Sequence, residues 1–209
     1  MIDQHIGIIC GCENNLVVVA SIRDSFIKMV EAYGAIILSA DEKNRLATQV
    51  FDPDTRSLKR LIICKSAQFI TEFAGIRRDK NIRLIIVPIR QHELQGPYGH
   101  EKLAPILSLY VVNDETEGIQ VCKQILINQG RGHRAVIYTQ NEELMKQFGR
   151  EIEASRILVN TPASQGCIGI GICLTPSFTL GCGTFGGNST TDNVSYIHLL
   201  NIKRLALNL

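Results

Sequence analysis

The chain has 209 residues, and its 22 Lys and Arg residues nearly balance its 20 Asp and Glu residues, which leaves a formal net charge of +2 at pH 7. Because it carries no basic stripe with interleaved aromatic residues, nucleic acid is not indicated as a partner. No apolar run reaches the roughly 20 residues that span a bilayer, and no signal-peptide pattern precedes the first predicted strand, so a membrane is not indicated either.

The seven cysteines are odd in number and show no zinc-ligand spacing. They therefore predict neither a disulfide scaffold nor a metal site. Free thiols are typical of the cytosol, and we expect a cytoplasmic protein.

Apolar runs alternate with helical patterns along most of the chain. Strands are predicted at 16–19, 35–38, 83–89, 106–112, 134–139 and 156–160. Helices are predicted between them, beginning near Ser21, at Ser39 or Asp41, at Ser66, at Asp114 and at Asn141. Residues 61–64 suit a further strand. The alternation predicts an α/β fold with a parallel sheet and helices on its faces.

Three segments stand outside this alternation. Residues 91–105 are polar and contain Gly and Pro, which predicts a long loop of the kind that often carries function. Residues 161–191 are rich in glycine, so their backbone is expected to approach another segment closely. Residues 198–207 are apolar and partly alternating, which predicts a last strand with no partner inside the chain.

One cysteine is singled out by its place in the sequence. Cys10 follows a short apolar run and directly precedes Gly11, at the entrance of the first predicted strand. A thiol on such a turn is held rigidly and stays accessible, and nearby backbone N–H groups can stabilise a thiolate and later an oxyanion. The alternative is that Cys10 packs as a small buried hydrophobe.

Residues 181–186 (GCGTFG) match the glycine pattern of dinucleotide-binding turns. That pattern should follow a strand, open a helix and precede an acidic residue about 20 positions further on. Here Gly-Asn-Ser follows and the acidic residue is missing. We therefore reject this interpretation.

The same glycine-rich string belongs to a wider pattern. Residues 180–189 (LGCGTFGGNS), 159–166 (VNTPASQG) and 198–203 (HLLNIK) resemble the C-terminal part of coenzyme-A-acylating aldehyde dehydrogenases, including the aldehyde module of bifunctional aldehyde–alcohol dehydrogenases. Residues 100–105 (HEKLAP) and 132–139 (GHRAVIYT) match in the same order. Residues 7–10 (GIIC) fall where that family keeps its catalytic cysteine.

The resemblance implies roles for individual residues. Cys10 would be the thiolate nucleophile, with its own backbone N–H as an oxyanion donor. Glu101 would contact the nicotinamide ribose, and His133 would handle the thiol proton of coenzyme A near the reaction centre. Small residues would line the substrate tunnel: Thr161, Ser164, Gly166, Gly181 and Cys182. The plain alternatives are a solvated loop acid, a turn histidine and glycines that serve tight turns.

The resemblance also implies a fold and an activity. It predicts a three-layer, parallel-sheet catalytic domain of the aldehyde dehydrogenase type over residues 1–197, and a C-terminal strand over 198–209 that pairs subunits of a homo-oligomer. The reaction would convert an aldehyde, coenzyme A and NAD to acyl-CoA and NADH through a cysteine thioester. The family's N-terminal cofactor-binding domain is expected to be absent, so we expect this chain alone to be inactive. An alcohol dehydrogenase module, fused or associated, would be a further partner.

Other interpretations stay open at this point. A catalytically silent assembly domain derived from the same fold would keep the C-terminal strand without a reactive thiol. Cys12 stands where the family usually has serine, and in sequence it is nearly interchangeable with Cys10. A redox sensor that uses both thiols ranks last, because cysteines so close in sequence form a strained bridge.

Overall fold

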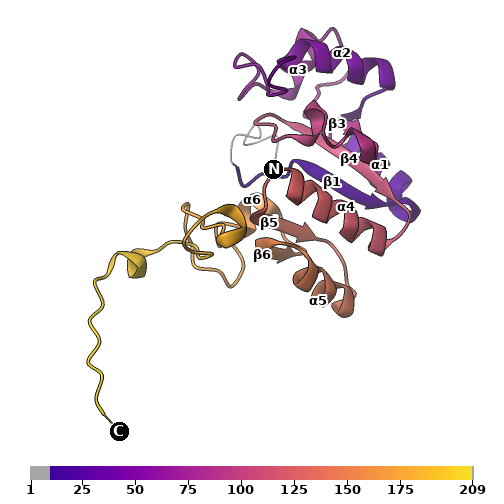
Figure 1. Ribbon diagram of the computed structural model, residues 1–209. Coiled ribbons are helices and arrows are strands. Elements are labelled where there is room, and N and C mark those ends of the chain that lie inside the picture. Colours follow the sequence, from indigo (N-terminus) through magenta and orange to yellow (C-terminus); the bar gives the residue numbers. More distant parts are fainter. Residues whose placement is uncertain (1–9, 209) are drawn as a thin grey trace.

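The structure is a computed structural model that describes residues 10–208. Its centre is a four-stranded sheet in the order β1 (Asn15–Val19), β4 (Ile106–Val112), β3 (Leu84–Pro88) and β2 (Ala35–Ile37). Figure 1 labels the first three of these strands. All three pairings are parallel. A separate parallel pair consists of β5 (Gly132–Ile137) and β6 (Ala154–Val159). Each of these six strands forms where an apolar run in the sequence predicted one.

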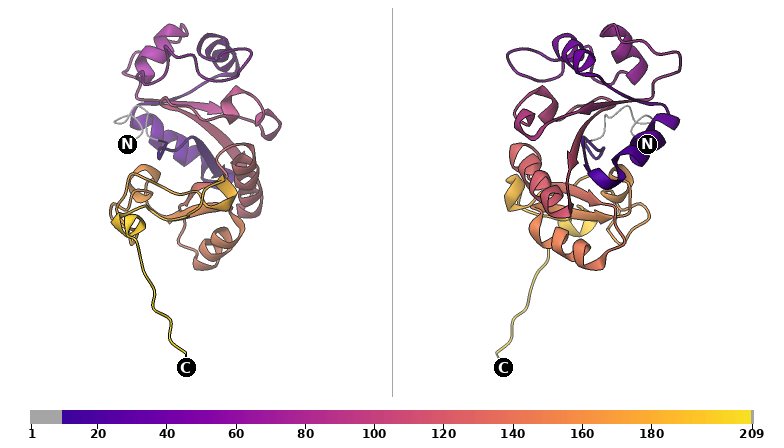
Figure 2. Two further views of the ribbon diagram at one scale, coloured as in Figure 1. Left: turned by 60° about the vertical axis from the view of Figure 1, so that its left-hand side comes forward. Right: turned by 90° about the vertical axis from the view of Figure 1, so that its right-hand side faces the viewer.

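Helices cover both faces of the four-stranded sheet. After a short 3-10 turn at Ala20–Ile22, α1 (Arg23–Ala32) packs on one face. The other face is covered by α2 (Ala40–Val50), α3 (Ala67–Phe73) and α4 (Glu115–Asn128). Figure 2 shows α1 on the side of the sheet away from α4. The predicted three-layer α/β class is therefore confirmed.

The second strand pair is joined to the first sheet through α4. One side of α4 packs Val121 and Ile125 on the four-stranded sheet. Its other side packs Ile119 and Leu126 against α5 (Glu142–Glu151) and the β5–β6 pair, together with Phe148. Helix α4 thus fixes where β5 lies relative to β1, and this relation positions the site described below.

Polar caps begin α2 to α5 where the sequence predicted them, whereas Ser21 lies inside the 3-10 turn before α1, whose N-cap, Ile22, makes no side-chain cap. Side-chain oxygens of Ser39, Ser66, Asp114 and Asn141 accept backbone N–H groups in the first turns of α2, α3, α4 and α5. At α2 the cap is reciprocal, because the Glu42 carboxylate accepts the Ser39 N–H at 3.0 Å. Such caps satisfy N–H groups that have no partner within the helix.

Replacing Glu42 by Gln is expected to destabilise the fold at neutral pH and much less in acid. The Arg78 guanidinium, 2.7 Å from the Glu42 carboxylate, lowers the pKa of Glu42 to about 2. A depressed carboxyl pKa stabilises the fold above the unfolded pKa of 4.5, and this stabilisation is lost as the pH falls towards 2. We expect a loss of about 1–2 kcal/mol at pH 7 after allowing for partial exposure.

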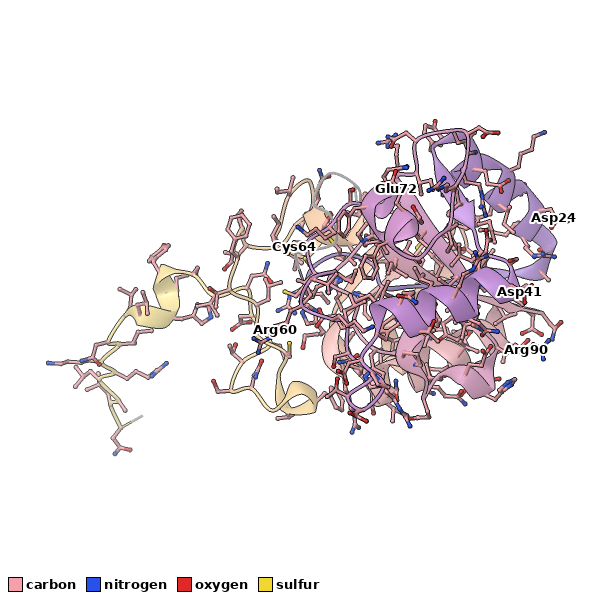
Figure 3. All side chains as sticks on the ribbon, turned by 90° about the horizontal axis from the view of Figure 1, so that it is seen from above. Asp24, Asp41, Arg60, Cys64, Glu72 and Arg90 are labelled. Carbon is pink, nitrogen blue, oxygen red and sulfur yellow. The ribbon has the colours of Figure 1, made fainter. Side chains whose placement is uncertain are left out.

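Urea unfolding at pH 7 and pH 3 measures this difference. The matched control is Asp41→Asn, which removes the same charge from the same first turn; Asp41 is exposed and is labelled in Figure 3. An equal loss for both variants, or a Glu42→Gln loss that stays constant between the two pH values, would contradict the prediction.

One predicted strand does not form, and the predicted C-terminal pairing segment has no strand in the described residues of the single chain. Residues 61–64 lie in turns, with Ile62 N–H bonded to Lys59 O and Cys64 at a φ of 65°. A left-handed residue ends an extended run, and local turn bonds replace the ladder that a strand needs. The stretch 198–207 begins in a 3-10 turn (Tyr196–Leu199) and continues without regular structure. Figures 1 and 2 show this tail leading away from the body, where no described strand is available to pair with it.

The glycine-rich segment folds irregularly, as predicted. It contains the short helix α6 (Ala163–Gly166) and a 3-10 turn at Thr184–Gly186, and an antiparallel bridge joins Leu180 to Asn193. The loop before β4 likewise contains 3-10 turns at Gln91–Glu93 and Pro97–Gly99. In residues 10–208, no helix has the length and apolar character needed to cross a membrane.

Candidate active site

The two N-terminal thiols differ in accessibility. Cys10 is exposed on the turn that leads into β1, whereas Cys12 is 1% exposed. A nucleophile must be reached by its substrate, so burial removes Cys12 as the equivalent candidate that the sequence left open. Residues 7–9 of the GIIC motif lie outside the described residues.

His133, the second predicted catalytic residue, lies on β5 close to the Cys10 segment. Its neighbour Arg134 donates hydrogen bonds to the backbone carbonyls of Cys10 and Cys12, and its guanidinium lies 2.9 Å from His133 Nδ1. Burial, acting together with the smaller effects of the Arg134 and Arg156 charges, lowers the pKa of His133 to about 4. At neutral pH the imidazole is therefore uncharged.

The first predicted tunnel segment packs beside the same turn. The Glu13 carboxylate accepts the Ala163 N–H at 2.8 Å, which ties the start of α6 to the residues that follow Cys10. Ser164 and Gly166 are buried and Thr161 is half-buried. A Cβ on Gly166 would come within 2.7 Å of the Thr161 methyl, so this position requires glycine for space. Backbone and small side chains therefore surround the site here.

Cys167, which directly follows α6, shows that Cys10 lies near this segment. Cys167 is fully buried, and burial raises the pKa of its thiol. The Arg134 charge acts against this rise, and Cys10 lies close enough to add to it. The exposed thiol thus lies within electrostatic reach of α6, as the resemblance implies.

The second tunnel segment reaches the site through Arg156 of β6. Arg156 is 3% exposed and donates to the carbonyls of Gly181 at 2.5 Å and His133 at 3.2 Å. From the other side, the turn at Gly132 approaches Cys182 so closely that a Cβ on Gly132 would overlap the Cys182 carbonyl. Gly181 and Cys182 are therefore held against β5, next to His133.

Glu101 is exposed on the loop that precedes β4. Its backbone N–H donates to the Gln129 side chain, and the N–H of Lys102 donates to Asn14 Oδ1 at 2.7 Å. Asn14 thus joins the Glu101 loop to the Cys10 segment. The exposed Glu101 carboxylate lies at this edge of the sheet, near enough for its charge to act on Lys102.

The loop is fixed from inside by Lys102, which is 1% exposed. Its ammonium donates to the carbonyls of Tyr98 at 2.8 Å and His100 at 2.9 Å, and burial lowers its pKa to about 7. Ser108 Oγ donates to the same Tyr98 carbonyl. These hydrogen bonds fix the backbone conformation of the loop next to Glu101.

Comparison with known proteins gives this arrangement a context. No protein-family model matches the chain. It is 33% identical over 205 residues to the bifunctional aldehyde-alcohol dehydrogenase AdhE of Escherichia coli K12, which is 96% of this chain and 23% of that protein. An acetylating aldehyde dehydrogenase from Geobacillus thermoglucosidasius covers the whole chain with a TM-score of 0.92 at 33% identity, over 46% of its own length. The resemblance to coenzyme-A-acylating aldehyde dehydrogenases is confirmed.

The likeness extends more weakly to a propionaldehyde dehydrogenase from Rhodopseudomonas palustris, whose structure holds CoA and an acylated cysteine. It shares the fold at 21% identity, with a TM-score of 0.73 over 90% of this chain and 44% of that one. The chain spans about a quarter of the length of the bifunctional relatives that it matches.

Five of the six segments that carry the likeness to acylating aldehyde dehydrogenases meet in one network of contacts. Cys10, the 100–105 loop, the start of β5, α6 and the 180–189 segment are joined by the bonds of Asn14, Glu13, Arg134 and Arg156. The sixth, 198–203, lies in the tail (Figure 1). The predicted site residues of the body are thus brought together, although they are spread over more than 170 positions from Cys10 to Cys182.

The sequence did not single out the residues that make these connections. Arg134 directly follows His133, and Arg156 lies inside the apolar strand β6, where a charged residue needs several acceptors. That position was the one available signal. Nothing in the sequence marks Asn14 or Glu13 as a connecting residue. Asn14 accepts from a residue 88 positions away, and Glu13 accepts from one 150 positions away.

A cleft of about 430 Å³ lies elsewhere, at the carboxyl ends of β2 and β3. Its walls include Ser39, Lys43, Arg90 and Glu93, and none of the residues assigned to the acylating site. The Cys10 segment and the Glu101 loop precede β1 and β4, so they lie at the opposite, amino-terminal edge of the sheet. In the described part of the chain, no group of three or more His, Cys, Asp or Glu side chains is placed to hold a metal ion.

Proposed function

We propose that this chain supplies the cysteine half of the active site of an NAD-dependent acylating aldehyde dehydrogenase. The enzyme would convert an aldehyde, coenzyme A and NAD to acyl-CoA and NADH. The observation that carries the proposal is the exposed Cys10, which contacts β5 through Arg134 next to His133 and lies beside α6. Its near neighbour in sequence, Cys12, is buried.

In this proposal Cys10 attacks the carbonyl carbon of the aldehyde and forms a thiohemiacetal. Loss of hydride from the carbon and of the proton from the hydroxyl oxygen leaves an acyl thioester on Cys10. The coenzyme A thiol, after giving its proton to solvent, takes the acyl group, and Cys10 leaves as a thiolate that is free for the next cycle. The Cys10 backbone N–H is the oxyanion donor, and His133 faces the coenzyme A thiol. A covalent intermediate divides one difficult step into two easier ones.

The residues present suit the cofactor that this reaction needs. Glu101 offers two carboxylate oxygens as acceptors for ribose hydroxyls, and Asn14 and Lys102 hold its loop beside the Cys10 segment. NAD, when bound, accepts the hydride. Thr161, Ser164, Gly166, Gly181 and Cys182 are proposed to bound the path to Cys10 with small side chains and backbone.

Alkylation of the native chain tests the nucleophile. Iodoacetamide near neutral pH is expected to modify Cys10 about tenfold faster than the exposed Cys64 and Cys173, because reactive cysteines lie in accessible, electropositive surroundings. Arg134 supplies that charge at Cys10. Cys64 lies on the turn before α3 (labelled in Figure 3). Cys122 should react slowly, because burial raises its pKa to about 11.

Peptide mass spectrometry after timed quenching gives the rate for each thiol. Cys10→Ser is the control that assigns the fast phase. A single rate shared by Cys10, Cys64 and Cys173 would contradict the catalytic proposal and favour a catalytically silent assembly domain.

One observation favours an assembly role in addition. The tail exposes several large apolar side chains, among them Leu199, Leu205 and Leu207, with Leu205 88% exposed. Apolar surface of this kind is typical of a segment that another chain covers. We propose that residues 198–209 pair subunits in a homo-oligomer, that an alcohol dehydrogenase module is a further partner, and that the seven free thiols belong to a cytoplasmic protein.

A further inference from the structure

Arg134 connects two parts of the site that lie far apart in sequence. It projects from β5, and its two terminal nitrogens donate to the carbonyls of Cys10 and Cys12, more than 120 positions away. Bidentate charged hydrogen bonds are the stronger kind, and they restrict geometry as well as adding energy. The short turn that carries Cys10 is therefore clamped to β5 at two backbone carbonyls, one on each side of Gly11.

The same guanidinium determines the hydrogen-bond pattern of His133. Nη1 of Arg134 lies 2.9 Å from His133 Nδ1. A guanidinium has donors only and keeps its proton at all relevant pH values, so Nδ1 must be the acceptor. An uncharged imidazole that accepts at Nδ1 carries its proton on Nε2.

We propose that Arg134 is a positioning residue that holds the Cys10 turn in place and keeps His133 in the Nε2–H form. The inference rests on the proposed function and refines it. With Nδ1 occupied by Arg134 and Nε2 protonated, neither ring nitrogen has a free lone pair. His133 then acts as a hydrogen-bond donor towards the substrate or towards the sulfur of coenzyme A, and it does not remove the thiol proton.

Charge around the ring agrees with this assignment. Arg134 on β5 and Arg156 on β6 both face His133, and together with burial they hold its pKa near 4. Protonating the ring would add a third positive charge and would break the contact with Arg134. The uncharged Nε2–H imidazole is the form that these two arginines leave available.

Nitrogen-15 NMR of the full chain reads the tautomer directly. At pH 7 the wild type is expected to show, for His133, a protonated Nε2 and an unprotonated Nδ1, with the signals assigned by their loss in His133→Gln. In Arg134→Met we expect a mixture of the two neutral tautomers. Hydrogen exchange of the Gly11 and Glu13 amides should also become about tenfold faster, because the local clamp is lost.

Two further variants complete the test. Arg150→Gln removes one positive charge from the exposed end of α5 and should leave both readings at wild-type values. Arg134→Lys keeps the charge, but one ammonium does not span both carbonyls and the ring, so amide exchange should be intermediate between wild type and Arg134→Met. If Arg134→Met fails to fold, Arg134→Lys alone decides, and exchange equal to that of the wild type overturns the proposal.

The positioning role is overturned by an Nδ1–H or doubly protonated His133 in the wild type at pH 7, or by readings that do not change in Arg134→Met. Neither reading depends on Cys10 being a nucleophile. Slow alkylation of Cys10 together with the expected tautomer would therefore overturn the catalytic proposal while leaving Arg134 its positioning role.

Discussion

Replacing Arg156 by Met is expected to lower the free energy of unfolding by about 3–5 kcal/mol. The guanidinium is buried and donates to Asn193 Oδ1 and to three backbone carbonyls, those of His133, Gly181 and Thr191. Methionine fills a similar volume but donates nothing, so these buried acceptors lose their partner. Each unsatisfied buried acceptor costs about 1–3 kcal/mol, and removing a buried charge offsets part of the sum.

Urea unfolding at pH 7 measures the Arg156 effect, with Arg150→Met on the exposed end of α5 as the control. Arg156→Lys keeps the charge but loses the planar guanidinium group. Its loss of unfolding free energy should therefore lie between those of Arg156→Met and Arg150→Met. A loss below about 1 kcal/mol for Arg156→Met would show that the glycine-rich segment is held in place by other contacts.

Local sequence patterns were enough to predict most of the strands and helices in the α/β part of the chain. The apolar runs at β3 and β4 are buried on both faces, and a run of this kind predicts a strand without knowledge of its neighbours. Ser39 with Glu42 three positions later predicts a helix start by itself. These features depend on residues a few positions apart, so the sequence shows them directly.

The failed prediction at residues 61–64 has a different cause. Residues 61–64 have a strand-like composition but find no neighbouring strand among the described residues. Residues 198–207 were predicted to pair with another subunit, and this pairing stays a prediction. A strand satisfies its backbone only through a partner, so its existence depends on tertiary contacts that a local pattern does not contain.

The site shows the same division. Cys10 was singled out by its place before the first strand, Glu101 and His133 were found through the family resemblance, and the structure brings their segments together. Arg134 was passed over although it adjoins His133, because its partners, the Cys10 and Cys12 carbonyls, are visible only in three dimensions. The choice between Cys10 and Cys12 was likewise made by burial.

Replacing Gly132 by Ala is expected to cost more than about 3 kcal/mol, whereas the same change at Gly130 should cost about 1–2 kcal/mol. Both glycines have left-handed backbone, with φ of 82° and 96°. A Cβ on Gly130 would meet nothing within 4 Å, but one on Gly132 would overlap the Cys182 carbonyl and lie 2.7 Å from the Gly186 nitrogen. The two variants therefore share the backbone strain and differ in the close approach.

Their difference isolates the contact that holds the Gly181–Cys182 segment against the start of β5, beside His133. In Gly132→Ala one of the two backbones must move, and the half-buried Cys182 thiol should become more accessible. Its alkylation rate in the native protein should then rise well above that of Gly130→Ala, along with the greater loss of stability in urea. Equal losses in the two variants, with no change at Cys182, would mean that strain alone accounts for the effect. The turn before His133 would then not position the glycine-rich segment.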